Sequence, residues 1–281
     1  DIILLVRSFK DSTELFLLDR AIKDGFLVAD ITLKFDDDGK IEDNYQINGF
    51  IKNGNLNFFN QLITNNLNLN FNIFKKKYFL KKINAEINDL KFSSPLIEIN
   101  EKKDLFFIKG KIKTSKKDFR IDQLSGMFAK LLKTQNIEKA RFSSENEISF
   151  NVSKKLKFND LNIKSKINLD QLVIKNNFIN LKPYLPNFNE LINFEKHKII
   201  INYDKDKIDI KGNGKILIKN KFDFINYHVI NSNSKFTFDT KLNLKNSKLL
   251  IHFLDYEKKE NLDASIIIKG NFKKNKSINF N

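Results

Sequence analysis

The sequence contains no cysteine and no tryptophan, and it has only one methionine and three prolines among 281 residues. The absence of cysteine excludes disulfides, thiolate metal sites and cysteine nucleophiles. The most apolar stretch, Ile2 to Val6, is far shorter than the roughly 20 residues that cross a bilayer as a helix. The chain starts at Asp1 without a charged-then-apolar leader, so we expect it to be a processed or excised piece of a longer protein.

The chain is basic, with a net charge of +16, but arginine is scarce. Nearly all the cations are lysine, and arginine is the residue that reads bases and phosphates in a bidentate way. We therefore expect no specific nucleic-acid partner. The abundance of Lys, Asn, Ile and Phe is typical of codon bias; the alternative is attraction to an anionic surface, with membrane headgroups ahead of nucleic acid. The arginines are Arg7, Arg20, Arg120 and Arg141.

Apolar and polar residues alternate along most of the chain, with the period of two that is typical of half-buried strands. In "NNLNLNFNIF", from Asn65, single asparagines separate four apolar residues. The pattern recurs in "FLVADITLKF" from Phe26, "LNIKSKINL" from Leu161 and "KFTFDTKLNL" from Lys235. Short turns separate about a dozen such runs, which indicates an antiparallel meander.

Turn and glycine signals punctuate these runs. Asn53-Gly54 predicts a two-residue hairpin turn, and Asp36 to Lys40 predicts another turn. An Ile-Lys-Gly core recurs at irregular spacing, so the repeating unit is a strand or hairpin. Glycines inside alternating runs are expected at bulges or bends that let a long sheet curl; they are Gly49, Gly110, Gly212, Gly214 and Gly270.

Two segments have the spacing of short amphipathic helices. The first would be capped by Ser12 or Thr13 and end at Gly25, and the second spans residues 122–134. The second belongs to a helical interruption near residues 121–136, and a loop is expected near residues 182–196. Neither interruption has the composition of a flexible linker, so we expect a single continuous β-groove segment over residues 1–281.

Motifs of catalysis and metal binding are absent from the sequence. His197, His228 and His252 are far apart and have no second ligand at metal spacing. If Gly39 were the glycine of a calcium loop, Lys34 and Tyr45 would occupy ligand positions, so the acidic run is read as a turn. "IKGNGK" lacks the strand-to-helix context of a phosphate loop. We therefore expect no enzyme, no cofactor and no metal.

Each predicted strand has one apolar and one polar face, so the sheet needs a cover on its apolar side. Helices are too few, which leaves a second sheet or a ligand. The expected fold class is mainly β: an elongated, curled antiparallel sheet, forming a half-pipe groove, with one or two short amphipathic helices. The candidate groove-lining residues are Leu67, Leu69, Phe71, Ile73, Leu161, Ile163, Ile167, Leu169, Phe236, Phe238, Leu242 and Leu244.

A short amphipathic segment followed by "DGFLVADITLKF", "INGFIKNGNLNF" and many alternating strands resembles the AsmA-like proteins, the repeating β-groove family that includes TamB and YhdP. The resemblance implies an envelope protein of Gram-negative bacteria that lies in the periplasm, with an inner-membrane anchor outside this chain. It also implies phospholipid acyl chains as partners, and contact with the inner and outer membranes through other parts of the parent protein.

The expected function is thus a non-catalytic, lipid-binding groove segment for phospholipid transport or outer-membrane assembly. The alternative from a different class is a closed β-sandwich or barrel that binds protein, glycan or polyanion through its Lys-rich exterior. A polyanion binder would lose affinity steeply with salt, whereas a lipid groove would not. The sequence leaves the oligomeric state, the lipid headgroup and the direction of transport open.

Overall fold

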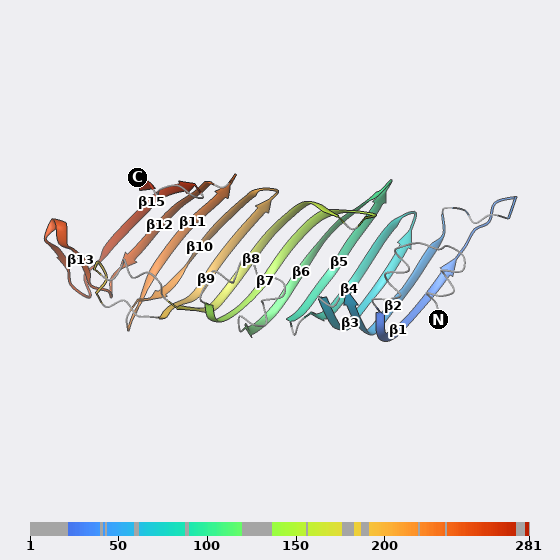
Figure 1. Cartoon of the computed structure of the whole chain (residues 1–281). Helices are drawn as coiled ribbons and strands as arrows, with labels where there is room; N and C mark the ends of the chain where they lie inside the picture. The colour runs from blue at the N-terminus through green and yellow to red at the C-terminus, as the bar shows by residue number, and fades with distance from the viewer. Residues whose placement is uncertain are drawn as a thin grey trace. The chain divides into compact units, whose positions relative to one another are not determined.

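The computed structural model of the chain describes residues 22–39, 42, 44–58, 62–87, 90–119, 137–155, 157–175, 183–186, 191–218, 220–233, 235–273 and 279–280 (Figure 1). These residues are nearly all in strands, and they form one large antiparallel sheet that is not closed into a barrel. The mainly β, antiparallel fold class is confirmed. The closed barrel of the alternative hypothesis is wrong for the described residues.

Strands follow one another in the sheet in sequence order, from β1 to β12 and then β15 and β16. The first six strands are Ile22–Thr32 (β1), Gln46–Phe58 (β2), Leu62–Phe74 (β3), Lys77–Ile87 (β4), Leu90–Lys102 (β5) and Leu105–Phe119 (β6). The next six are Ile137–Ser153 (β7), Phe158–Lys175 (β8), Leu191–Asp204 (β9), Lys207–Leu217 (β10), Phe222–Ser232 (β11) and Lys235–Leu244 (β12). They are followed by Leu249–Ile251 (β13), Tyr256–Lys258 (β14), Ala264–Lys273 (β15) and Asn279–Phe280 (β16).

The chain divides into two compact units. Unit 1 comprises Asp1–Ser115 and Glu147–Leu161, and unit 2 comprises Lys116–Asn146 and Asn162–Asn281. Strands β6, β7 and β8 contribute residues to both units. The single continuous segment expected from the sequence stays a prediction.

The hairpin turn predicted at Asn53-Gly54 is wrong, because β2 runs straight through these residues. Asn53 has a left-handed backbone (φ 52°), and the pairing of β2 with β3 shifts between Ile51 and Gly54. The Asn53 N–H donates a hydrogen bond to Asn68 Oδ1 at 3.1 Å, so an asparagine of β3 satisfies the backbone group that the ladder leaves unpaired. Asn-Gly here makes a bulge in a long strand.

The helix expected to end at Gly25 is wrong for its last four residues, because residues 22–25 belong to β1. Their pairing with β2 competes with helix formation. The rest of that segment and the interruption near 121–136 lie outside the described residues. The loop expected near 182–196 ends early, since β9 begins at Leu191. The turn at Asp36 to Lys40 is confirmed at its described residues, where the Gly39 N–H donates to Asp36 O at 2.9 Å.

Unit 2 contains a small hairpin made of β13 and β14, joined by the 3-10 turn η2 (His252–Leu254). Leu249 of β13 packs in a buried cluster with Leu244 and Ile218. The Leu250 N–H donates to Tyr184 O at 2.9 Å, which ties β13 to the turn that carries Leu185. The hairpin and this turn therefore cover the apolar side of unit 2 near Leu244. The other buried members of the cluster are Leu185, Ile192 and Ile216.

A buried polar network fixes the base of this hairpin. The Asp223 carboxylate accepts hydrogen bonds from the N–H groups of Lys245 and Asn246, both at 2.8 Å, and from Ser247 Oγ at 2.6 Å. The ammonium of Lys258 donates to Lys245 O at 3.1 Å and to Ser247 O at 2.7 Å. Burial lowers the pKa of Lys258, and the negative charge of Asp223 opposes that shift. The network thus joins β11, the loop after β12, and β14.

We expect Asp223→Asn to lower the free energy of unfolding by about 2–4 kcal/mol, because a neutral amide cannot accept all three bonds and leaves the Lys258 ammonium without its buried counter-charge. Urea unfolding followed by far-UV circular dichroism measures the change. Asp239→Asn is the matched control: its carboxylate is exposed and pairs with Lys269 at 2.9 Å, so a loss below about 1 kcal/mol is expected. Equal losses in the two variants would contradict the role of the network.

Candidate functional site

The apolar face of unit 1 is built from rows of side chains that neighbouring strands place opposite one another. Residues directly paired in an antiparallel sheet lie on the same face, so a row can be followed from strand to strand through the register. Two rows cross β1 to β6: Ala29, Gly49, Phe71, Leu80, Ile97 and Gly110; and Ile31, Ile47, Ile73, Tyr78, Ile99 and Ile108. All six strands therefore present apolar groups to one side.

Unit 2 has an apolar face of the same construction. Its rows extend from β8 through β9, β10, β11 and β12, and all three continue to β15, where Phe236 pairs with Phe272. The rows are Ile163, Tyr203, Ile208, Asn231 and Phe236; Ser165, Ile201, Ile210, Val229, Phe238 and Gly270; and Ile167, Ile199, Gly212, Tyr227, Thr240 and Ile268. Apart from Ser165, Asn231 and Thr240, the members of these rows are aliphatic or aromatic residues or glycine.

The structure places most of the predicted groove-lining residues on these two faces. Ile163 and Phe236 share one row of unit 2, although β9, β10 and β11 lie between their strands. Leu161 is 38% exposed and precedes Asn162, where the pairing of β8 with β9 begins. Leu244 is fully buried in the cluster beneath the hairpin. Leu67, Leu69 and Leu169 are buried; Phe71, Ile73, Ile163, Ile167, Phe236, Phe238 and Leu242 are half-buried.

The side chains of these rows are mostly half-buried, unlike those of a closed hydrophobic core. Side chains that a second layer covers are fully buried, as Leu244 is beneath the hairpin. Most apolar side chains of the rows instead keep part of their surface exposed, including Ile31 and Ile268 at the ends of their rows. Such faces retain exposed apolar surface. Covering that surface with a further apolar group is energetically favourable.

The opposite face is polar, and several of its lysines have partners within the chain. In unit 1 the ammonium groups of Lys52 and Lys81 lie over the rings of Phe50 and Phe79, at 5.4 and 6.0 Å from the ring centroids. In unit 2 the ammonium of Lys269 pairs with Asp239 at 2.9 Å. Lysine stems thus cover the apolar groups on this side while their charges remain in water.

His197 is buried within the apolar face of unit 2, and no local sequence pattern indicated a role for it. Its Nε2 lies 2.9 Å from Lys215 O, and its Nδ1 lies 3.3 Å from the hydroxyl of Tyr227. Burial lowers the pKa of His197, and burial raises the pKa of Tyr227 to about 12. Both groups are therefore neutral near pH 7, and they place hydrogen-bonded polar atoms among apolar neighbours without adding charge.

Glycines make room for the large rings of these rows. A Cβ atom built at Gly214 would overlap the imidazole of His197, and one built at Gly212 would overlap the ring of Tyr227. In unit 1 a Cβ at Gly49 would lie 2.5 Å from Cζ of Phe71. An aromatic ring lying over a glycine shields backbone that a strand would otherwise expose. The sequence signal for these pairs is the glycine inside an alternating run, which predicts a bulge or bend. That prediction is confirmed at Gly214, where the pairing of β10 with β9 shifts, but it does not include the contact with a ring.

The asparagines between the apolar residues of β3 serve the ladder at its irregular points. Asn66 has a left-handed backbone (φ 52°), and its N–H donates to Asn55 Oδ1 at 3.3 Å. Asn68 Nδ2 donates to Asn66 O at 2.7 Å, and Asn72 donates to Asn48 across the polar face. Asparagine tolerates the left-handed conformation and carries its own donor and acceptor, which suits it to bulges.

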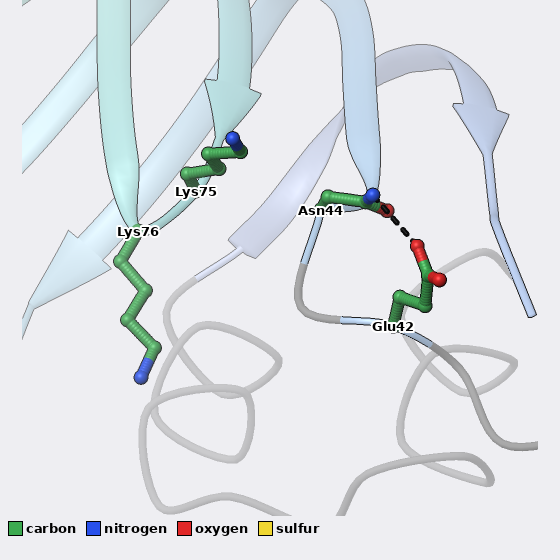
Figure 2. A pocket seen from close by; sticks show the side chains of 4 residues that line it. All are labelled: Glu42, Asn44, Lys75 and Lys76. Carbon is green, nitrogen blue, oxygen red and sulfur yellow. Dashed lines mark hydrogen bonds between the residues drawn. The ribbon is translucent and has the colours of Figure 1, made fainter. Parts of the chain in front are cut away.

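A surface pocket of about 380 Å³ lies at one end of unit 1 (Figure 2). Lys75 and Lys76, from the turn between β3 and β4, line one side, and Glu42 and Asn44 line the other. Asn44 Nδ2 donates to Glu42 Oε2 at 2.7 Å, so part of the polar lining is satisfied internally. The described lining is polar and charged, which does not suit an acyl chain.

Within the part of the chain that the structure describes, no group of three or more histidine and carboxylate side chains is placed to hold a metal ion. None of the helices among these residues has the length and apolar composition that a membrane-crossing helix requires. Compared with protein-family models, with curated proteins and with solved structures, the chain matches none. The functional argument therefore depends on the geometry and chemistry of the two apolar faces.

We expect Gly214→Ala to lower the free energy of unfolding by about 1–3 kcal/mol, because the added methyl overlaps the imidazole of His197. In a His197→Ala background the same substitution should cost much less, giving a coupling of about 1 kcal/mol or more in a double-mutant cycle. Urea unfolding of the four proteins provides the measurement. Additive effects would show that the glycine is required for another reason.

Unfolding should also depend on pH through His197. Its pKa is lower in the folded state than the ordinary 6.5, so the unfolded chain binds the proton more readily below that pH. The stabilisation is complete above pH 6.5 and is lost as the pH falls toward the folded-state pKa, at no more than about 1.4 kcal/mol per pH unit. His197→Gln should flatten the dependence between pH 7.5 and 5.5. Identical slopes in wild type and His197→Gln would refute this assignment.

Proposed function

We propose that this chain is a non-catalytic segment of a lipid conduit, in which phospholipid acyl chains lie against the apolar faces of the sheet. The observation that carries the proposal is the continuity of half-buried apolar rows from strand to strand within each unit. In line with the resemblance to the AsmA-like family, the proposed setting is the periplasm of a Gram-negative envelope. The inner-membrane anchor would lie in another part of the parent protein.

The size of a row supports an acyl chain as the occupant. Six strands at a spacing of about 4.8 Å extend a row over about 24 Å. One leaflet of a bilayer accounts for about half of a hydrocarbon core of roughly 30 Å. A single row of apolar side chains is therefore long enough to follow one acyl chain, in either unit separately.

Energetics favour movement along such a face. Burying one methylene stabilises by about 0.8 kcal/mol, or about 12 kcal/mol for a sixteen-carbon chain. A bilayer offers the same chain a similar stabilisation, so transfer from membrane to protein is close to neutral, whereas passage through water is strongly opposed. A conduit of this kind needs apolar contact and no catalytic group. Neutral His197 and Tyr227 are compatible with it because they place no charge on the face.

The test is binding of a fluorescent fatty acid, together with native mass spectrometry for lipid retained from the host membrane. Ile73→Asp and Phe238→Asp place a carboxylate on the apolar faces of units 1 and 2, and each should weaken binding about tenfold or more, because a charge among acyl methylenes is costly. Wild type should carry phospholipid, with an affinity for the fatty acid that changes little between low and high salt.

Asn72→Asp and Thr237→Asp are the matched controls, because they add the same charge to the same strands on the polar face. Circular dichroism and urea unfolding identify variants that remain folded. Equal loss in face variants and controls, or a lipid-free wild type, would refute the conduit. Binding of a polyanion such as heparin, with an affinity that falls steeply with salt, would instead support the Lys-rich exterior as the functional surface.

A further inference from the structure

The tip of the β13–β14 hairpin exposes apolar side chains that the fold could have buried. Phe253 is 79% exposed and Leu254 is 63% exposed, and both are in the 3-10 turn η2. Tyr256 and Leu262 are also exposed nearby in the sequence. Figure 1 shows the hairpin standing out from the neighbouring strands of unit 2. Exposed apolar groups gathered at a protruding turn are typical of a contact surface.

The turn is held in its conformation rather than left free. Asp255 ends η2 with a left-handed backbone (φ 49°), and its N–H donates to His252 O at 3.2 Å. Below the turn, Leu249 packs in the buried cluster, and the Asp223–Lys258 network fixes both sides of the base. The backbone that carries Phe253 and Leu254 therefore has little conformational entropy left to lose on contact.

Charge around the tip is balanced, in contrast to the chain as a whole. The segment from Lys245 to Asp263 contains four lysines and four carboxylates, whereas the whole chain has a net charge of +16. Lys248 pairs with Glu257 at 3.0 Å, and Lys258 is buried in the network. A neutral rim around exposed apolar groups fits a zwitterionic surface better than an anionic one, for which lysines would have to predominate.

The size of the exposed group also distinguishes between occupants. A stable protein–protein interface buries about 800 Å² on each partner, whereas an aromatic side chain buries about 150–250 Å². Two or three protruding side chains fall well short of a protein interface. They suit shallow insertion at the headgroup boundary, where the amphipathic ring of Tyr256 also belongs.

We infer that the tip of this hairpin docks on a zwitterionic membrane surface by inserting Phe253 and Leu254 among the lipid acyl chains. The role of that contact rests on the proposed function: Leu249 of the hairpin belongs to the buried cluster, and Leu242 and Ile266 of the apolar face pack against that cluster. Docking would bring the membrane's acyl chains close to the end of that face. The contact itself requires only the tip.

The chain has no tryptophan, so Phe253→Trp creates a single indole reporter. With phosphatidylcholine vesicles, its emission should shift to the blue and be quenched by brominated acyl chains. Phe158→Trp is the matched control, because Phe158 is 71% exposed at the start of β8 and should stay in water. An unchanged emission of the Phe253→Trp protein would overturn the inference. So would a blue shift that depends on protein concentration without vesicles, because it would show that a second copy covers the tip.

Flotation with the same vesicles provides an independent measurement. The double variant Phe253→Ser/Leu254→Ser should bind vesicles at least about tenfold more weakly than wild type, at low and high salt alike. Its fluorescent fatty-acid binding should be unchanged. Unaltered flotation of the double variant would overturn the docking inference while leaving the conduit intact. Vesicle docking by a wild type that binds no fatty acid would refute the conduit and leave the docking site standing.

Discussion

Cross-strand register is the constraint on which the other features of this protein depend. Because side chains alternate along a strand, a slip of one residue between any two neighbours would move every apolar group of one strand to the other face. The rows through Phe71 in unit 1 and Phe238 in unit 2 exist only because each consecutive pair of strands keeps the same phase. A single strand out of phase would interrupt the apolar face with asparagine and lysine.

Long strands accumulate twist, and bulges keep the apolar residues of neighbouring strands on the same face despite that twist. Left-handed residues within strands, such as Asn53 and Lys196, lie where an extra residue is inserted on one strand, and pairing then resumes with the apolar residues again facing the same side. Glycines serve a second need, since the rings of His197 and Tyr227 lie where a Cβ atom at Gly214 or Gly212 would overlap them. Asparagine and glycine, which weaken isolated strands, are thus the residues that let these strands pair over their full length.

Much of this arrangement could be predicted from the sequence because it depends on a local period of two. The alternation in "NNLNLNFNIF" and "KFTFDTKLNL" correctly predicted strands, antiparallel order and the residues that share a face. The Asn53-Gly54 bulge was misread as a turn, because the same dipeptide serves both and only the pairing partner decides. The hydrogen bonds of the Asp223–Lys258 network and the His197–Tyr227 contact join residues more than ten positions apart, and no local pattern encodes such pairs.

Consecutive strand order has an evolutionary consequence. Each strand makes its ladder bonds with its sequence neighbours, apart from the excursion of β13 and β14 between β12 and β15. Stability in such a chain is close to a sum of neighbour terms, so a hairpin can be gained or lost by duplication or deletion without rearranging the rest. The gain or loss of two strands preserves both the phase and the direction of the chain that follows. The gain or loss of an odd number of strands would reverse that direction. Lineages carrying this architecture are expected to differ in length by whole hairpins.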